Sequence, residues 1–160
     1  MNTKFNSAEE ILDYAIEKEE EAARFYFELA QQNLPEKTRK LLEGFTDTEL
    51  KHRELLKEVK NGKAQLKDES IHNFEVAQIA EEAEIKEGMT IAEALAVAME
   101  RELASYRLYI ELAAAATTYE TLDMFVLLAQ EEARHRLWLE KEYNKPKEYN
   151  KPVENLVLNN

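Results

Sequence analysis

The sequence predicts an all-α protein, a four-helix bundle made of two repeated helical hairpins joined by a long crossover. Helix-forming residues dominate, and the 160 residues contain only three Gly and three Pro. Four segments of about 25 residues carry apolar side chains at helical spacing. A shift of 83 residues aligns the two halves of the chain without a gap. We expect the bundle over residues 1–143 and an extended C-terminal tail over 144–160.

The first hairpin has clear start and stop signals. Ser7 begins a capping-box pattern, from which the first helix runs to about Gln32. Pro35 suits the first turn of the second helix, which we expect to reach about Lys60. Gly62, preceded by Asn, is typical of the residue that ends a helix.

A more polar segment separates the two hairpins. Residues 63–88 are less regular, and a short helix over about 74–84 fits there. Thr90 then caps a third helix, which we expect to end near Thr117. The connection is long enough to carry the chain from one end of a bundle to the other.

The fourth helix is expected from about Tyr119 to Tyr143. The stretch E-Y-N-K-P follows at 142–146 and again at 148–152. Its two prolines favour an extended tail, either on this bundle or on a partner.

Charge and composition exclude several classes of function. The formal net charge of −12 makes nucleic acid an unexpected partner. The absence of Cys excludes disulfides, thiolate zinc sites and iron–sulfur clusters from these residues. No apolar run approaches the roughly 18 residues that a membrane span needs, and the first residues do not resemble a signal peptide. We therefore expect no membrane contact and a cytoplasmic location.

Two Glu-x-x-His motifs align with each other when the two halves of the chain are superposed by the 83-residue shift. Glu49 aligns with Glu132 and His52 with His135, and each motif fills a gap in the apolar stripe of its helix. Residues three apart share a helix face, so each pair can reach one site. Glu131, beside Glu132, is expected to point elsewhere, into solvent.

A third match to the motif, Glu69-x-x-His72, has a different context. It lies in the irregular crossover and has no counterpart 83 residues away. We expect these two side chains to be ordinary surface residues.

Two further glutamates are expected in the core. Glu19 and Glu102 align across the repeat and lie on the apolar stripes of the first and third helices. Tyr26 and Tyr109 follow seven residues later on the same stripes. Each tyrosine is expected either to pack in the core with a bonded hydroxyl, or to donate to a ligand carboxylate or relay electrons.

The predicted core thus contains four carboxylates and two imidazoles with no Lys or Arg on the same stripes. Raised pKa values could neutralise some of these groups, but unpaired buried charges cost several kcal/mol each. Two divalent cations cancel the four negative charges directly. Mixed carboxylate and imidazole ligation suits iron or manganese and can accept zinc. Ferritin-like dinuclear proteins have this same ligand set. It consists of one Glu from each of two helices and a Glu-x-x-His from each of the other two.

These motifs resemble the ferritin-like diiron domain of the rubrerythrin family over about residues 7–142. The resemblance implies two iron ions, with manganese or zinc as possible substitutes. It also assigns the ligand roles: bridging Glu49 and Glu132, terminal Glu19 and Glu102, and one histidine, His52 or His135, on each iron.

The resemblance further implies a diiron oxidoreductase of peroxidase or oxidase type, acting on hydrogen peroxide or dioxygen, and a homodimer, in some members with exchanged helices. Iron binding or storage without turnover is the alternative, and purely structural metals are a third. Peroxidase-type members carry another glutamate at the position of Ser105, which here matches Ala22, so we expect a more symmetric site. No rubredoxin domain is found in this sequence, so a separate electron-donor protein is expected.

Overall fold

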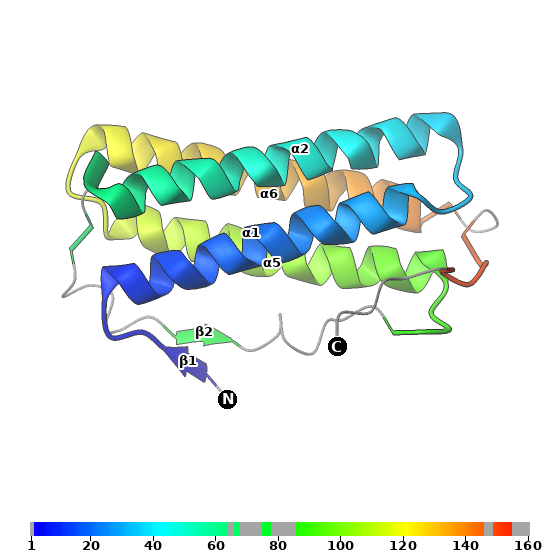
Figure 1. The fold of residues 1–160 in the computed structure, drawn as a ribbon, viewed down its shortest axis with the longest axis horizontal. Coiled ribbons are helices and arrows are strands. Elements are labelled where there is room, and N and C mark those ends of the chain that lie inside the picture. The colour runs from blue at the N-terminus through cyan, green and yellow to red at the C-terminus, as the bar shows by residue number, and fades with distance from the viewer. Residues whose placement is uncertain (1, 64–65, 68–74, 78–85, 146–148, 155–160) are drawn as a thin grey trace.

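Four long helices lie side by side in one bundle (Figure 1). The computed structural model describes residues 2–63, 66–67, 75–77, 86–145 and 149–154. The helices are α1 (Ala8–Ala30), α2 (Glu36–Glu58), α5 (Ile91–Ala114) and α6 (Tyr119–Tyr143). The predicted four-helix bundle of two hairpins is confirmed, and every helix boundary falls within about three residues of its expected place.

The helices begin and end where the sequence supplies the right chemistry. The Ser7 hydroxyl accepts a hydrogen bond from the N–H of Glu10 at 3.2 Å and starts α1. Thr90 and Glu93 form a complete capping box at the start of α5. After α2, one π-helical turn (Val59–Lys63) contains Gly62 at φ 90°, a left-handed conformation that glycine adopts without strain.

The predicted crossover is confirmed as well. The last turn of α2 and the first turn of α5 lie at opposite ends of the bundle (Figure 1). The expected short helix over 74–84 is wrong where it can be checked. Residues Glu75–Ala77 form strand β2, which pairs antiparallel with β1 (Asn2–Lys4). The remaining residues of that prediction, together with Glu69 and His72, lie outside the described part of the chain.

Two apolar clusters form the core, one toward each end of the bundle. Complete burial of a large apolar side chain, such as Leu, Ile or Phe, stabilises the fold by about 1.5–3 kcal/mol. In all four helices the glutamates predicted for the core lie between the two clusters along the chain, so a polar layer crosses the bundle between apolar ones. The large, fully buried side chains include Ile11, Leu56, Leu112 and Phe125 in one cluster and Leu29, Leu42, Leu95 and Leu139 in the other.

The described part of the tail, residues 149–154, packs on the bundle itself. The N–H groups of Ile91 and Ala92, at the start of α5, donate to the carbonyls of Lys151 and Tyr149 at 2.9 and 3.0 Å. These N–H groups have no partner within the helix, so the tail supplies the acceptors that the first turn lacks. The Tyr149 ring is buried.

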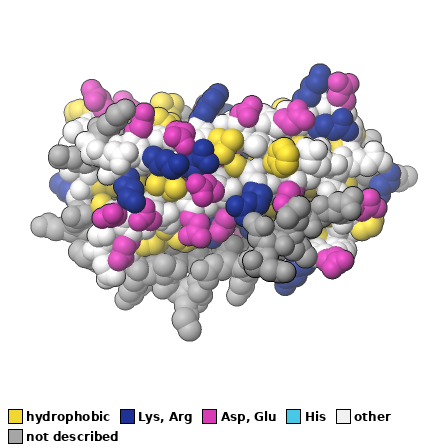
Figure 2. Space-filling view, viewed as in Figure 1, with side chains coloured by type: hydrophobic (Ala, Val, Ile, Leu, Met, Phe, Trp, Pro, Cys, Tyr) yellow, Lys and Arg dark blue, Asp and Glu magenta, His cyan; other side chains and the backbone are white. Residues whose placement is uncertain are grey.

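Acidic and basic side chains are mixed on the face of the molecule seen in Figure 2. That distribution agrees with a solvated, highly charged surface. Within the described residues, no helix is long and apolar enough to cross a membrane.

Candidate metal centre

The structure brings all six predicted ligand side chains together in the polar layer. Each of the four helices contributes through a buried position of its inner face. None of the six is more than 7% exposed. The contributors are Glu19 on α1, Glu49 and His52 on α2, Glu102 on α5, and Glu132 and His135 on α6.

The six side chains form two overlapping sets of four. The donor atoms of each set lie within 4.8 Å of one another, and both sets contain Glu49 and Glu132. Ligand atoms about 2.0–2.2 Å from one cation lie up to about 4.4 Å apart, so each set is close to the size needed around one ion. Two sets that share two carboxylates match a dinuclear site with two bridging ligands. The first set adds Glu19 and His52, and the second adds Glu102 and His135.

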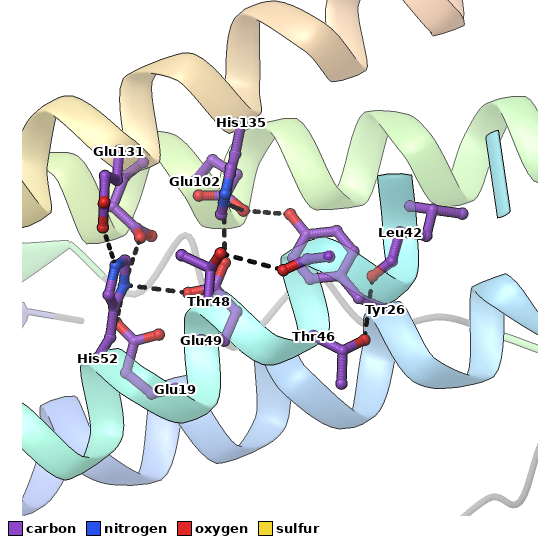
Figure 3. Close-up of polar contacts among 12 residues, drawn as sticks. Glu19, Tyr26, Leu42, Thr46, Thr48, Glu49, His52, Glu102, Glu131 and His135 are labelled. Atoms are coloured by element: carbon purple, nitrogen blue, oxygen red, sulfur yellow. Dashed lines mark hydrogen bonds and ion pairs between the residues drawn. The ribbon is translucent and has the colours of Figure 1, made fainter. Parts of the chain in front are cut away.

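Both imidazoles direct the same nitrogen at the carboxylates. Nδ1 of His52 lies 2.9 Å from Glu132 Oε1 and 3.2 Å from Glu49 Oε2. Nδ1 of His135 lies 2.9 Å from Glu49 Oε1 and 3.4 Å from Glu102 Oε1. Figure 3 shows the two rings on either side of Glu49. Each imidazole is therefore oriented toward the space between the carboxylates.

Many of the oxygen and nitrogen atoms that could bind a metal in this cluster have no hydrogen-bond partner. They include both oxygens of Glu49, one oxygen each of Glu19, Glu102 and Glu132, and both Nδ1 atoms. The two Nδ1 atoms are close to carboxylates but lack well-directed hydrogen bonds. Leaving a buried polar group unsatisfied costs about 1–3 kcal/mol, and more when it is charged. Unsatisfied oxygens and nitrogens converging on two points fit two metal ions.

The electrostatics of the cluster lead to the same conclusion. Burial raises the pKa of Glu49 well above its ordinary value, and the carboxylates of Glu102 and Glu19 raise it further. The pKa of Glu132 is raised by burial and by the same neighbours. For His52, burial opposes the charged form, but the surrounding carboxylates, that of Glu132 foremost, raise its pKa overall. Without cations, the site retains protons to offset its negative charge, and bound cations would take their place.

Each predicted tyrosine donates to a glutamate of the opposite half of the repeat. The Tyr26 hydroxyl donates to Glu102 Oε1, and the Tyr109 hydroxyl donates to Glu19 Oε1. Burial, followed by the nearby carboxylates, raises the pKa of both tyrosines, which keeps the phenols protonated as donors. The structure thus supports both expectations for these residues, core packing and hydrogen bonding to a candidate ligand.

Glu131 corrects an expectation from the sequence. Its side chain is 42% exposed, as a surface glutamate would be, but Oε2 lies 2.5 Å from Nε2 of His52 (Figure 3). One residue corresponds to about 100° around a helix, which directs Glu131 toward α2 rather than toward the centre of the bundle. No signal in the sequence marks this contact, because His52 belongs to another helix.

A cavity lies between α1 and α5, near the terminal carboxylates. Its lining includes Lys18 and Ala22 from α1 and Arg101 and Ser105 from α5. Ala22 and Ser105 follow Glu19 and Glu102 by three residues, about one helical turn on the same face. The small side chains at these two positions therefore leave space beside the polar layer.

Comparisons with known proteins identify the family and the fold. The rubrerythrin family model matches residues 10–153. The chain also resembles the crystal structure of a proposed ferritin-like diiron-carboxylate protein from Thermotoga maritima, with 21% sequence identity and a TM-score of 0.70. The match covers 89% of this chain and 98% of the other, which shows that the fold is shared. No curated protein matches the chain.

Proposed function

The chain belongs to the rubrerythrin family, and from this premise we propose that it holds two iron ions and carries out redox chemistry with hydrogen peroxide or dioxygen. One observation carries the proposal: two buried sets of four donor atoms that share Glu49 and Glu132. Carboxylate and imidazole donors without thiolate suit iron, and also manganese.

In this proposal the helices provide a fixed geometry. Glu49 and Glu132, which belong to both donor sets, would be shared by the two ions, while Glu19 with His52 and Glu102 with His135 would complete the two positions. Hydrogen bonds from Tyr26 and Tyr109 fix the two terminal carboxylates. Such partners outside the ligand shell orient the ligands and tune the ion that they bind. The apolar clusters on both sides of the layer limit the access of water.

Reduction of one hydrogen peroxide to two waters takes two electrons and two protons, and two bound ferrous ions would supply the two electrons. Dioxygen takes the same two electrons and two protons to become hydrogen peroxide. The cavity beside Ala22 and Ser105 lies about one helical turn from Glu19 and Glu102, and its volume of about 30 Å³ suits an oxidant this small. The charge at the cavity is partly paired, because Lys18 forms an ion pair at 3.0 Å with Glu21, which also lines it.

Repeated turnover needs a source of electrons. These 160 residues contain no Cys, so they hold no thiolate-bound iron centre that could donate. We propose a separate one-electron carrier that returns two electrons to the site for each oxidant reduced.

The test is stopped-flow spectroscopy of protein loaded anaerobically with two ferrous ions per chain and mixed with hydrogen peroxide or dioxygen. We expect ferric absorption within seconds, and a Glu49→Gln variant that lacks this rapid phase. Ferrous protein that shows no change over minutes with either oxidant would overturn the redox function. Particle size provides a second check: a large hollow assembly that takes up many ions per chain would instead favour storage.

A further inference from the structure

The two candidate metal positions are alike on the inside and different on the outside. Inside, each has one terminal glutamate, one histidine and one tyrosine hydrogen bond, related by the 83-residue repeat. In the alignment of the two halves, Glu131 corresponds to Thr48, so a carboxylate in one half is replaced by a hydroxyl in the other. The difference concerns the outer nitrogen of each histidine.

The outer nitrogen of His52 is bonded to a carboxylate. Nε2 lies 2.5 Å from Oε2 of Glu131, which comes from the neighbouring helix α6 (Figure 3). A carboxylate accepts only, so the ring must carry its hydrogen on Nε2 in this pair. In the neutral ring, the lone pair of Nδ1 then points at Glu132 and Glu49, where a cation would bind. Glu131 thereby fixes both the tautomer and the direction of this ligand.

His135 has different surroundings. The hydroxyl of Thr48 donates to the carbonyl of Gly44 at 3.0 Å, within its own helix. Among the described residues, no side chain hydrogen-bonds to Nε2 of His135. Its ring instead stacks on Phe45, with centroids 4.0 Å apart and an interplanar angle of 29°. Stacking restrains the plane of the ring, but it leaves the tautomer free.

We propose that Glu131 is a positioning residue that makes the two metal positions unequal, so that the first divalent ion binds beside His52 and the second beside His135. The inference rests on the proposed dinuclear site and adds an order of loading to it. Partners of this kind change metal affinity by about 10- to 100-fold, so we expect at least a 10-fold preference for the His52 position.

The experiment is a titration of metal-free protein with Zn²⁺, followed by NMR of ¹⁵N-labelled histidine side chains. Zinc is diamagnetic and accepts the same donors. Single His→Gln variants assign the signals. With one equivalent of Zn²⁺, we expect Nδ1 of His52 to shift while most of His135 is unchanged, and the second equivalent should shift His135. In the metal-free protein, Nε2 of His52 should already carry a hydrogen, whatever the protonation of Nδ1.

Matched variants exploit the repeat. Glu131→Thr copies the residue found at position 48 and should remove both the preference and the fixed tautomer. Glu131→Gln keeps an acceptor oxygen and should retain the tautomer. Adding Thr48→Glu to Glu131→Thr should move the preference to His135. Both side chains are at least partly exposed, and circular dichroism checks that each variant is folded.

Each other outcome contradicts the inference in a distinct way. Simultaneous shifts of both rings, or His135 first, would overturn the order while leaving the dinuclear site intact. A preference for His52 that persists in Glu131→Thr would show that Glu131 is not its cause. If neither ring responds to two equivalents, the dinuclear site itself is wrong, and the inference fails with it.

Discussion

The hydroxyl of Tyr26, on α1, donates a hydrogen bond to Oε1 of Glu102, on α5, and so connects the two halves of the repeat. Tyr109 and Glu19 form the same connection in the opposite direction. Each hairpin therefore holds one carboxylate of the other. The two hairpins form one site because each supplies the tyrosine hydroxyl that hydrogen-bonds to a buried glutamate of the other.

Removing either hydroxyl should weaken both the fold and the site. Tyr26→Phe deletes the donor to a buried carboxylate while keeping the ring. A hydrogen bond to a charged group contributes about 1.5–3 kcal/mol, so we expect a loss of this size in the free energy of unfolding of the metal-free protein. Metal affinity should fall by about 10- to 100-fold. Urea unfolding and metal titration measure the two effects.

Tyr149→Phe is the matched control for this change. Tyr149 is equally buried and donates to Glu142 at 2.6 Å, at a distance from the metal site along α6. The Tyr149→Phe variant should have a lower free energy of unfolding but an unchanged metal affinity. Equal metal affinity in Tyr26→Phe and the wild type would contradict the role given to Tyr26.

The stability of the metal-free protein should decrease as pH rises. The pKa values of Glu49 and Glu132 are raised in the folded chain, mainly by burial, above the ordinary value of about 4.5. A group with a raised pKa stabilises the fold fully below its unfolded pKa, and this contribution disappears as pH rises through the folded value. His52, also raised, acts in the same direction above its ordinary value of 6.5. Thermal melts between pH 5 and pH 8 measure the slope.

Two controls identify the source of that slope. Glu49→Gln replaces a buried carboxylate by a neutral group of similar shape, so its melting temperature should depend less on pH. Two equivalents of a divalent ion should stabilise the wild type more at pH 8 than at pH 5, because fewer protons compete for the ligands at the higher pH. A metal-free wild type that gains stability between pH 5 and pH 8 would be inconsistent with a proton-retaining cluster.

The shared carboxylates should matter for both ions and the terminal ones for one. Glu49→Gln should lower the affinity for both ions, whereas Glu19→Gln should chiefly affect the ion beside His52. Glu43→Gln, an exposed change on the same helix as Glu49, should alter neither. Isothermal titration resolves the two binding steps. Loss of a single ion in Glu49→Gln would argue against its bridging role.

The repeated E-Y-N-K-P stretch offers a test of the tail. Tyr149, in the second copy, is 2% exposed and hydrogen-bonded to Glu142, whereas Tyr143, in the first copy, is 45% exposed. Tyr149→Ala should cost about 3–5 kcal/mol in unfolding free energy, as large buried aromatics do. Tyr143→Ala should change it by about 0.5 kcal/mol or less. A loss for Tyr149→Ala as small as the loss for Tyr143→Ala would show that the tail does not stabilise the bundle.

Local signals and the repeat predicted most of the fold. Thr90 with Glu93, and Asn61 with Gly62, mark helix ends by backbone chemistry that depends on neighbouring residues alone. The buried glutamates were found because each occupies a position in an apolar stripe that a solvated residue would not occupy. The 83-residue repeat distinguished the two aligned Glu-x-x-His motifs from a third match with no counterpart.

The features that the sequence did not predict depend on contacts between distant segments. The strand at Glu75–Ala77 exists because Asn2–Lys4 pairs with it, and neither segment has a strong pattern of its own. The position of Tyr149 depends on the open first turn of α5, far away along the chain. Glu131 was assigned to solvent because its own helix gave no reason to place it inward. Its partner, His52, belongs to another helix, and only the packed bundle shows their contact.

The most direct test of a dinuclear centre is the number of ions bound per chain. Metal-free protein should be dialysed anaerobically against excess Fe²⁺, desalted and analysed for iron and protein together. We predict two iron ions per chain, and a large decrease in the Glu49→Gln variant. One ion per chain, or none, would contradict the dinuclear centre.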